Sequence, residues 1–423
     1  MIRSPEAAGY FAGAIPSSRI TPLAGKLLHG SLFLTILASP LVFIEPSPYE
    51  AAAGLLVIAC VIAGVKLDRK VLPLALLLLI FNVCGAMALL PVADDGKVLT
   101  YAAVSFYLAI TAFVYACLFA EDSMRRLEIL RRAYLIAAVL ACLAGIAGYF
   151  GIWPGGELYG RARGTFKDPN VFGPFLVLPL LFLMQSMFNS GRRFFHLVLF
   201  CLLTFGLLLS FSRGAWGHFA FSAAVLIGLT FLTAPDIRTR ARLIVLSVMS
   251  VVALAGFLTV ALSFDSVGNL FKERAKLTQS YDVGSGGRFV LQEQATQTVL
   301  ENPAGVGPYE FQRVFGLQQH NVYLQAFLVY GWGGGLAYVT LLMLTLLVGF
   351  RFALVTTPWQ PYLIAAFATF CGEVGEGFVI DTDHWRHFFL LLGMIWGLAA
   401  ATINARRKDL LRATMAAHSS NPR

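Results

Sequence analysis

From Val71 to Val92 the chain has the sequence VLPLALLLLIFNVCGAMALLPV, which contains no charged residue. A run of about 20 apolar residues is long enough to cross a bilayer as a helix. Similar stretches recur on both sides of this one, at 27–44, 49–65, 98–120, 133–152, 170–188, 194–211, 215–233, 243–264, 322–350, 358–380 and 385–403. Because a spanning segment must satisfy its backbone hydrogen bonds internally, the pattern predicts an all-α polytopic membrane protein with about twelve transmembrane helices.

The composition supports one membrane domain without an appended soluble domain. Hydrophobic residues make up 58% of the 423 residues and charged residues 13%, against about 25% charged in a typical globular protein. We expect the membrane domain to span 27–403, between an N-terminal tail (1–26) and a C-terminal tail (404–423). The first apolar stretch is not followed by a small-residue cleavage site, so it predicts a retained helix. The six cysteines lie in or beside apolar stretches and predict neither a disulfide framework nor a metal site.

Lysine and arginine predict which side each loop faces, because they concentrate in cytoplasmic loops. With a cytoplasmic N-terminus, the inner segments hold 21 of the 32 basic residues and 7 of the 23 acidic ones. These segments are 1–26, 66–70, 121–132, 189–193, 235–242, Arg351 and 404–423. The inner net charge is then +14 and the outer net charge −5, which together give the total of +9. Both termini are predicted to be cytoplasmic, and the basic total reflects topology and not nucleic-acid binding.

The longest polar segment, 265–320, lies between the ninth and tenth predicted helices and is predicted to face outward. It contains two helix-compatible stretches (271–279 and 288–300), a glycine-rich link (284–287) and a predicted turn (302–307). Arg288 would lie in the first turn of the second helix, where the helix N-terminus itself favours anions. A solvated loop arginine is the alternative interpretation.

Other basic residues on the outer side also form groups. Arg161, Arg163 and Lys167 precede a spanning helix, together with Asn170. Either Asp168 or Asn170 is expected to cap that helix, and phosphate binding would explain the three cations. Arg213 stands between two apolar stretches with almost no loop. It is predicted either to reach the membrane interface as an ordinary boundary residue or to grip a diphosphate with its guanidinium.

Three further groups carry titratable or polar side chains near the outer surface. His320 and Asn321 end the long polar segment where apolar sequence resumes, and an unperturbed histidine suits proton transfer near neutral pH. Asn321 is a candidate for substrate binding. Glu373 and Glu376 lie inside the eleventh apolar stretch, so they are candidates for substrate binding or for ion pairs with Arg213 or Arg386. The polar turn 381–387 has no spacing that predicts a metal site. Glycines at 331 and 333–335 would allow close helix approach.

Taken in order, these groups resemble the O-antigen ligase and polymerase superfamily of bacterial inner-membrane glycosyltransferases. The resemblance rests on four motifs: RGTF at 163–166 with Pro169-Asn170, Ser212-Arg213-Gly214, Gly287-Arg288 with Asn302-Pro303 and Gly305-Val-Gly307, and His320-Asn321-Val-Tyr-Leu324. It implies a GT-C-type helical bundle with a periplasmic active site under the long loop. One departure is that Gln292 and Glu293 stand where an aromatic residue often follows the Gly-Arg pair.

The resemblance also implies roles for the residues that match its motifs. The donor would be a glycan on undecaprenyl diphosphate, with neither a metal nor a nucleotide sugar required as cofactor. Arg213 and Arg288 would bind the diphosphate, and His320 would act on the acceptor hydroxyl. Two arginines can stabilise the negative charge that grows on the leaving diphosphate. Other membrane proteins of polysaccharide assembly would be partners.

Four functional assignments are open: ligase and polymerase within the superfamily, a transporter or flippase, and a structural scaffold. A ligase moves the finished chain to lipid A–core, and a polymerase extends the lipid-linked glycan. No arginine in the loops 153–169 or 265–320 has a glycine eleven positions later, which is a polymerase feature, and His320-Asn321 with Leu324 favours ligase. A transporter or flippase of lipid-linked glycans is disfavoured, because most apolar stretches lack carboxylates and no inverted repeat is visible. A structural scaffold is the remaining alternative.

Overall fold

The computed structural model describes residues 21–43, 46–189, 193–263, 268, 271 and 287–419. Nearly all of this part of the chain is helical. The α-helices are α2 (Pro22–Ala38), α3 (Pro48–Ile62), α4 (Leu72–Leu89), α5 (Gly96–Ala120), α6 (Ser123–Tyr149), α7 (Pro169–Phe175), α8 (Val177–Asn189), α9 (Arg193–Leu209), α10 (Arg213–Leu232), α11 (Ile237–Leu262), α13 (Arg288–Glu301), α14 (Glu310–Phe315), α15 (Val322–Ala353), α16 (Gln360–Glu376) and α17 (Arg386–Ser419). Short 3₁₀ turns and one antiparallel ribbon complete the described part: η1 (Arg69–Val71), η2 (Leu90–Val92), η3 (Pro154–Gly156), β1 (Glu157–Leu158) and β2 (Arg161–Ala162).

The helices agree with a polytopic membrane protein. Each of the twelve predicted stretches overlaps a helix, and seven helical segments of the described chain are long and apolar enough to cross a membrane. Three further apolar helices, α2, α3 and α9, are shorter. The number of twelve spans therefore stays a prediction, whereas the all-helical, integral-membrane class agrees with the structure.

Several helix boundaries differ from the predicted ones. Helix α2 begins at Pro22, five residues before the expected start, because Thr21 caps it by accepting a hydrogen bond from the Ala24 backbone. Helix α17 continues through the predicted tail to Ser419, since 404–419 contains neither glycine nor proline. The predicted stretch 170–188 is split into α7 and α8 at Leu176, beside Pro174. Proline removes a backbone donor, and this favours the break.

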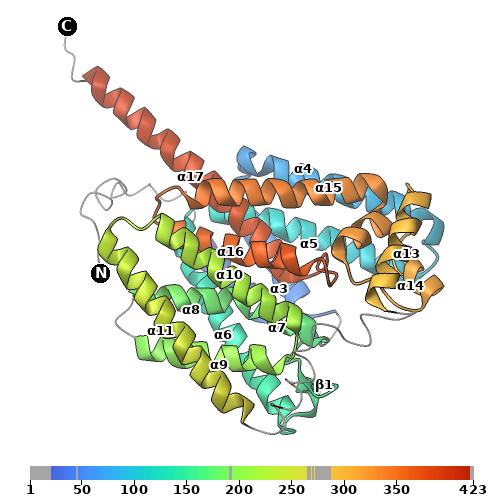
Figure 1. The fold of residues 1–423 in the computed structure, drawn as a ribbon. Helices are drawn as coiled ribbons and strands as arrows, with labels where there is room; N and C mark the ends of the chain where they lie inside the picture. The colour runs from blue at the N-terminus through green and yellow to red at the C-terminus, as the bar shows by residue number, and fades with distance from the viewer. Residues whose placement is uncertain are drawn as a thin grey trace.

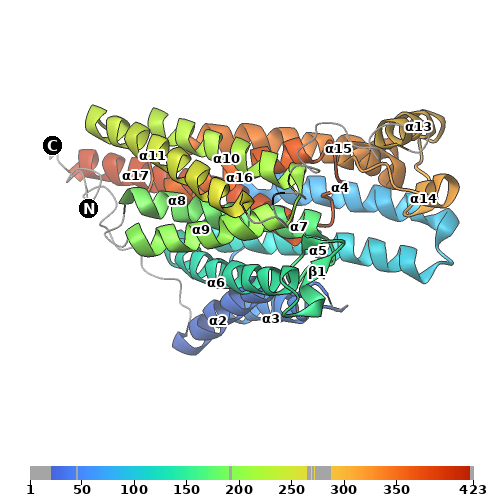
Figure 2. The ribbon, with the colours of Figure 1, turned by 60° about the horizontal axis from the view of Figure 1, so that its bottom comes forward.

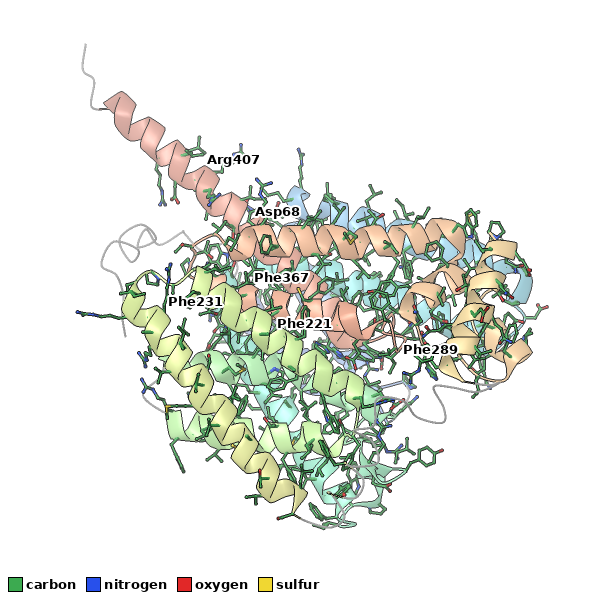
Figure 3. All side chains as sticks on the ribbon, in the orientation of Figure 1. Asp68, Phe221, Phe231, Phe289, Phe367 and Arg407 are labelled. Carbon is green, nitrogen blue, oxygen red and sulfur yellow. The ribbon has the colours of Figure 1, made fainter. Side chains whose placement is uncertain are left out.

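The helices pack as a bundle with α5, α16 and α17 at its core (Figure 1). Helix α17 lies along α5, α15 along α4, and α10 along α16. Side chains on the flanks project outward (Figure 3), as Phe221 on α10 does with 54% exposure. Phe367 on α16 is instead 5% exposed and packs at Gly349 of α15. An apolar exterior of this kind suits contact with lipid.

The loops of the bundle gather at two opposite ends (Figure 2). At one end lie α13, α14 and the β1 ribbon, and the C-terminal part of α17 extends from the other. At this second end, the side chains of Asp68 and Lys70 hydrogen-bond Asn404, and the Tyr362 hydroxyl donates to Glu128 at 3.1 Å. These residues belong to segments predicted to be cytoplasmic or to their edges. The separation of the two loop sets agrees with the predicted alternation, while the side that each end faces stays a prediction.

Candidate functional site

The polar segment before α15 is fastened to the bundle by a turn. The backbone N–H of Val306 donates to the Leu328 carbonyl at 2.7 Å, and that of Trp332 donates to the Pro303 carbonyl at 2.9 Å. Gly331 breaks the regular helix here with φ 65° and ψ −176°. A Cβ on Gly331 would lie 2.7 Å from the Ala304 carbonyl oxygen, so only glycine leaves room for the turn. The predicted turn at 302–307 is confirmed, and it holds α13 against α15.

Close helix approach at the glycines after Gly331 is also observed. A Cβ on Gly333 would lie 2.9 Å from Cys84 Sγ on α4. The close packing of α15 on α4 therefore depends on a small residue at this position.

Arg288 is the first residue of α13, as predicted, and Gly287 precedes it as the N-cap. One turn later, the Gln292 side chain donates to the carbonyls of His320 at 3.4 Å and Phe378 at 3.3 Å. Gln292 therefore ties the N-terminal turn of α13 to the start of α15. The other predicted helix (271–279) and the glycine-rich link (284–287) lie outside the described residues, apart from Phe271 and Gly287. Phe271 stacks on Trp216 of α10 with ring centroids 5.3 Å apart.

His320 lies between the α13 turn and the loop that follows α16. Its backbone has φ 49°, a left-handed conformation that is uncommon outside glycine. Its Nδ1 is 3.9 Å from Asp381 Oδ2, and its side chain is 46% exposed. Burial and the nearby Arg288 guanidinium lower the pKa of His320 below its ordinary value, and Asp168 acts in the opposite direction. At neutral pH the imidazole is therefore mainly neutral and able to accept a proton.

Asp381 supplies the carboxyl group that lies beside the His320 imidazole. Burial and the neighbouring Asp383 raise the pKa of Asp381 to about 7, against the weaker opposing effects of the Asn321 backbone N–H and of Arg288. The Gln319 amide donates to Asp381 Oδ1 at 3.3 Å. The carboxyl group is thus close to its midpoint of ionisation at neutral pH, beside a titratable imidazole. Perturbed titratable pairs of this kind are typical of functional sites.

A chain of hydrogen bonds continues from Gln319 into the bundle. Gln319 donates to Gln325 at 2.7 Å, and Gln325 donates to the Tyr101 hydroxyl at 3.2 Å. The Tyr101 hydroxyl donates to Asp383 Oδ2 at 2.7 Å, and the same carboxylate oxygen lies 3.0 Å from His384 Nδ1. Gln319 and Asp383 are 1% and 3% exposed. This network fixes the backbone on both sides of His320 and Asp381 through α5.

The predicted basic group at 161–170 is tied to the turn that precedes Arg213. Arg161 donates to the Ser210 carbonyl at 2.8 Å and to Asn170 Oδ1 at 2.7 Å. Asp168 caps α7 by accepting from the Asn170 backbone at 2.7 Å, so the cap is Asp168 and not Asn170. Arg213 begins α10, directly after its N-cap Ser212. The 161–170 loop therefore supports the turn that presents Arg213.

Three other predicted binding residues have local roles in the structure. Arg163 donates to the carbonyls of Gly155 and Lys167, both in its own loop. Lys167 is exposed and lines a cavity together with Asp168. Asn321 caps α15 by accepting from the Tyr323 backbone at 3.0 Å, and its amide donates to the Phe378 carbonyl. Of these three, Lys167 is the one placed where a ligand could reach it.

Glu373 and Glu376 are buried in the bundle, with 1% and 5% exposure. Glu376 Oε2 lies 2.8 Å from His218 Nδ1 on α10, and Glu373 Oε1 lies 3.6 Å from His387 Nε2 on α17. Of the two ion-pair alternatives, the one with Arg386 is not observed in the described part of the chain, because Arg386 binds Glu50 of α3. Glu376 also touches the start of α10, since a Cβ on Gly214 would lie 2.8 Å from its Oε1. Helix α16 therefore joins the Arg213 turn to the Asn321 turn.

Sequence reasoning missed Asp381, Gln319 and the Tyr101–Asp383 pair. The polar turn 381–387 was the available signal, because it places two acids between apolar helices on the predicted outer side. Tyr101 and Gln325 were hidden among apolar residues of spanning helices. No cluster of three or more His, Cys, Asp or Glu side chains that could hold a metal ion occurs within the described part of the chain.

Arg288, His320 and Asp381 therefore bring together a cation at a helix N-terminus, a mainly neutral histidine and a carboxyl group. Arg213 is a second cation at a helix N-terminus, that of α10. Helix N-termini and guanidinium groups both attract phosphate oxygens. A neutral imidazole with a carboxyl partner can take a proton from a hydroxyl. The arrangement is chemically suited to group transfer from an anionic leaving group to a hydroxyl.

Comparison with known proteins agrees with this chemistry. Residues 197–339 match the family model described as O-antigen ligase. The matched region contains Arg213, Arg288 and His320, and it excludes both the 161–170 loop and Asp381. A search of curated proteins gives no match to the chain.

Proposed function

We propose, from the match of residues 197–339 to the O-antigen ligase family model, that this protein belongs to the O-antigen ligase and polymerase superfamily and is an O-antigen ligase. It transfers a glycan from undecaprenyl diphosphate to a hydroxyl of lipid A–core at the periplasmic face of the bacterial inner membrane. The observation that carries the proposal is the meeting of Arg288, His320 and Asp381. These residues come from three separate parts of the chain and provide a cation, a base and a carboxyl group in one place.

The proposed reaction is a single displacement at the anomeric carbon. The bond between that carbon and the diphosphate oxygen breaks, and a bond to the acceptor oxygen forms. His320 takes the proton of the acceptor hydroxyl, and undecaprenyl diphosphate leaves. Arg213 and Arg288 stabilise the negative charge that grows on the leaving diphosphate.

Asp381 is proposed as a positioning residue for His320. An ionised carboxylate near Nδ1 stabilises the imidazolium that forms when His320 accepts a proton. Arg288 has the opposite effect, because its charge keeps the free imidazole neutral before transfer. The two neighbours together favour a histidine that is neutral at rest and readily protonated during the reaction.

Alanine variants of Arg213, Arg288 and His320 test the proposal. We expect each variant to be inserted at the wild-type level and to lose transfer, by about 100-fold or more where a charge-stabilising group is removed. Arg313→Ala is the matched control, since Arg313 is an exposed arginine at the same end that pairs with Asp95 and Glu310. Surface pairs of this kind contribute little. Normal transfer by the His320→Ala protein would contradict the catalytic role and favour a transporter or a scaffold.

The surface glycans of a deletion strain distinguish ligase from polymerase. Loss of a ligase leaves lipid A–core uncapped while long chains accumulate on the lipid carrier. Loss of a polymerase leaves single repeat units. The second result would replace the proposed acceptor with the growing lipid-linked glycan and keep the proposed chemistry.

A further inference from the structure

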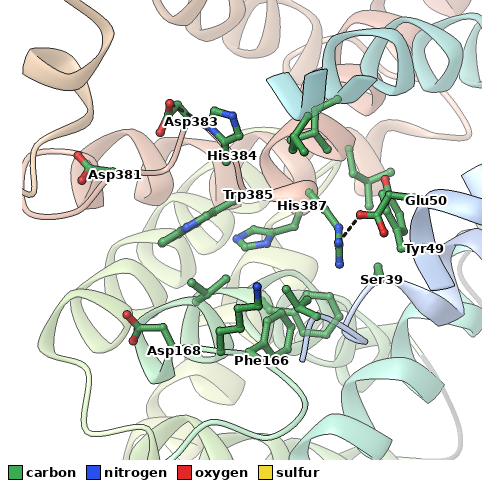
Figure 4. Close-up of a pocket in the computed structure, with 18 of the residues that line it drawn as sticks. Ser39, Tyr49, Glu50, Phe166, Asp168, Asp381, Asp383, His384, Trp385 and His387 are labelled. Atoms are coloured by element: carbon green, nitrogen blue, oxygen red, sulfur yellow. Dashed lines mark hydrogen bonds and ion pairs between the residues drawn. The ribbon is translucent and has the colours of Figure 1, made fainter. Parts of the chain in front are cut away.

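A cavity of about 690 Å³ lies beside the candidate site (Figure 4). Its walls come from the α2–α3 connection, α3, α5, the loop before α7, the start of α15, and the turn leading into α17. The volume falls within the range of about 300–1,000 Å³ that is usual for small-molecule sites. Asp381 lines the cavity and also lies 3.9 Å from His320. A molecule in this cavity would therefore be next to the proposed base.

The charges of the cavity do not suit a diphosphate. Four carboxyl groups line it, those of Glu50, Asp168, Asp381 and Asp383. Of the two cations in the wall, Arg386 already binds Glu50 and lies 4.8 Å from the centre of the Tyr49 ring. His384 Nδ1 likewise lies 3.0 Å from Asp383 Oδ2, so these cationic groups are already matched by carboxyl groups of the wall and offer a diphosphate little attraction. The cavity is thus distinct in character from the Arg213 and Arg288 side of the site.

Uncharged polar side chains supply both donors and acceptors to the wall. Ser39, Thr100, Gln318 and Gln325 line the cavity. Hydroxyl and amide groups can each donate and accept hydrogen bonds. A ligand that carries both donors and acceptors therefore suits these side chains.

Aromatic rings form much of the remaining wall. Tyr101, Tyr309 and Trp385 line the cavity, and the rings of Tyr101 and Tyr309 meet edge to face with centroids 5.5 Å apart. Figure 4 shows Trp385 beside His387, with Asp168 and Phe166 across the cavity. Flat rings pack against the apolar faces of sugar rings, while hydroxyl groups act as both donor and acceptor. A saccharide satisfies both requirements of this wall.

We propose that this cavity is the subsite for the saccharide of the acceptor, an uncharged sugar ring whose reactive hydroxyl points towards Asp381 and His320. The assignment rests on the proposed glycan transfer, and it adds where the acceptor binds. The donor diphosphate then occupies the Arg213 and Arg288 side, and the two substrates meet at His320.

Binding of free saccharides to the full-length protein in lipid nanodiscs tests the proposal. The probes are the core oligosaccharide and the repeat-unit oligosaccharide, each released by mild acid from the glycans of the source strain. Saturation-transfer NMR reports saccharide contact, and a parallel titration with undecaprenyl diphosphate reports the donor side. We expect at least one oligosaccharide to give a signal with the wild-type protein.

Two variants alter the cavity by different means. Ser39→Phe fills it from the α2–α3 side, where Ser39 lines the wall. Tyr309→Asn removes an aromatic wall, and asparagine tolerates the φ of 65° at this position. We expect both variants to lose the saccharide signal several-fold and to keep binding undecaprenyl diphosphate. Ala51→Phe, at an exposed position of α3, is the matched control and should bind both probes normally.

Arg288→Ala should show the opposite pattern: it should lose undecaprenyl diphosphate binding and keep the saccharide signal. The proposal is overturned if neither oligosaccharide binds the wild-type protein, if both cavity variants keep the wild-type signal, or if Arg288→Ala loses the signal. Saccharide binding in the cavity together with normal surface glycans in the deletion strain would keep the cavity as a saccharide site, but it would refute the proposed function and with it the acceptor role of that saccharide.

Discussion

The substitution Asp381→Asn tests the coupling between His320 and its carboxyl neighbour. Opposite charges about 4 Å apart attract by about 4 kcal/mol at an effective dielectric constant of about 20, and the two side chains are 3.9 Å apart. Because His320 is 46% exposed, solvent screening should reduce the useful stabilisation of the imidazolium to about 1–2 kcal/mol. We expect the rate of transfer at pH above 7 to fall about 5- to 30-fold.

The pH dependence separates this role from a structural one. Asp381 ionises as the pH rises through about 7, so the wild-type rate should increase across that range. His320 has a lowered pKa and is already mainly neutral near pH 7, so its own titration changes the rate only at lower pH. In the Asp381→Asn protein the increase near pH 7 should disappear, and the step at lower pH should remain.

The assay is the initial rate of glycan transfer by protein in lipid nanodiscs, measured across a pH series with saturating lipid-linked donor. Asp94→Asn is the control, because Asp94 is an exposed aspartate in the loop between α4 and α5. A wild-type rate and pH profile for the Asp381→Asn protein would refute the reasoning. A uniform loss of rate at every pH, with the profile unchanged, would indicate a structural role only.

Three further outcomes are expected. Arg213→Lys should lower the transfer rate about 10- to 100-fold, because a lysine loses one of two charge-assisted hydrogen bonds to phosphate, and activity in isolated membranes measures it. Gly331→Ala should destabilise the protein by about 1–3 kcal/mol or more. The backbone φ of 65° strains any other residue, and an added Cβ would lie 2.7 Å from the Ala304 carbonyl oxygen. Thermal unfolding measures the loss, with Gly228→Ala as the control because a Cβ there meets nothing within 4 Å. His218→Ala should cost about 3–5 kcal/mol by leaving Glu376 buried without its partner, and replacing both residues by leucine should recover much of the loss in the same measurement.

Much of the architecture followed from local properties of the chain. Long apolar runs predicted helices because a membrane leaves the backbone no other partner. Gly287 and the glycines and proline at 302–307 also indicated local structure. Helix α13 starts after Gly287 and the turn forms at 302–307, as predicted. Boundaries were less predictable, since α17 continues to Ser419 where composition alone suggested a tail.

For the candidate site, the sequence alone determined the residue types that needed an explanation. Arg213, Arg288 and His320 were identifiable because cations and a histidine at the predicted outer ends of apolar segments are unusual. Only the tertiary structure decided their neighbours. Asp381 approaches His320, and Tyr101 holds Asp383, across separations of 61 and 282 residues. No periodicity or spacing encodes such contacts, because they depend on how α5, α15 and α16 pack together in space.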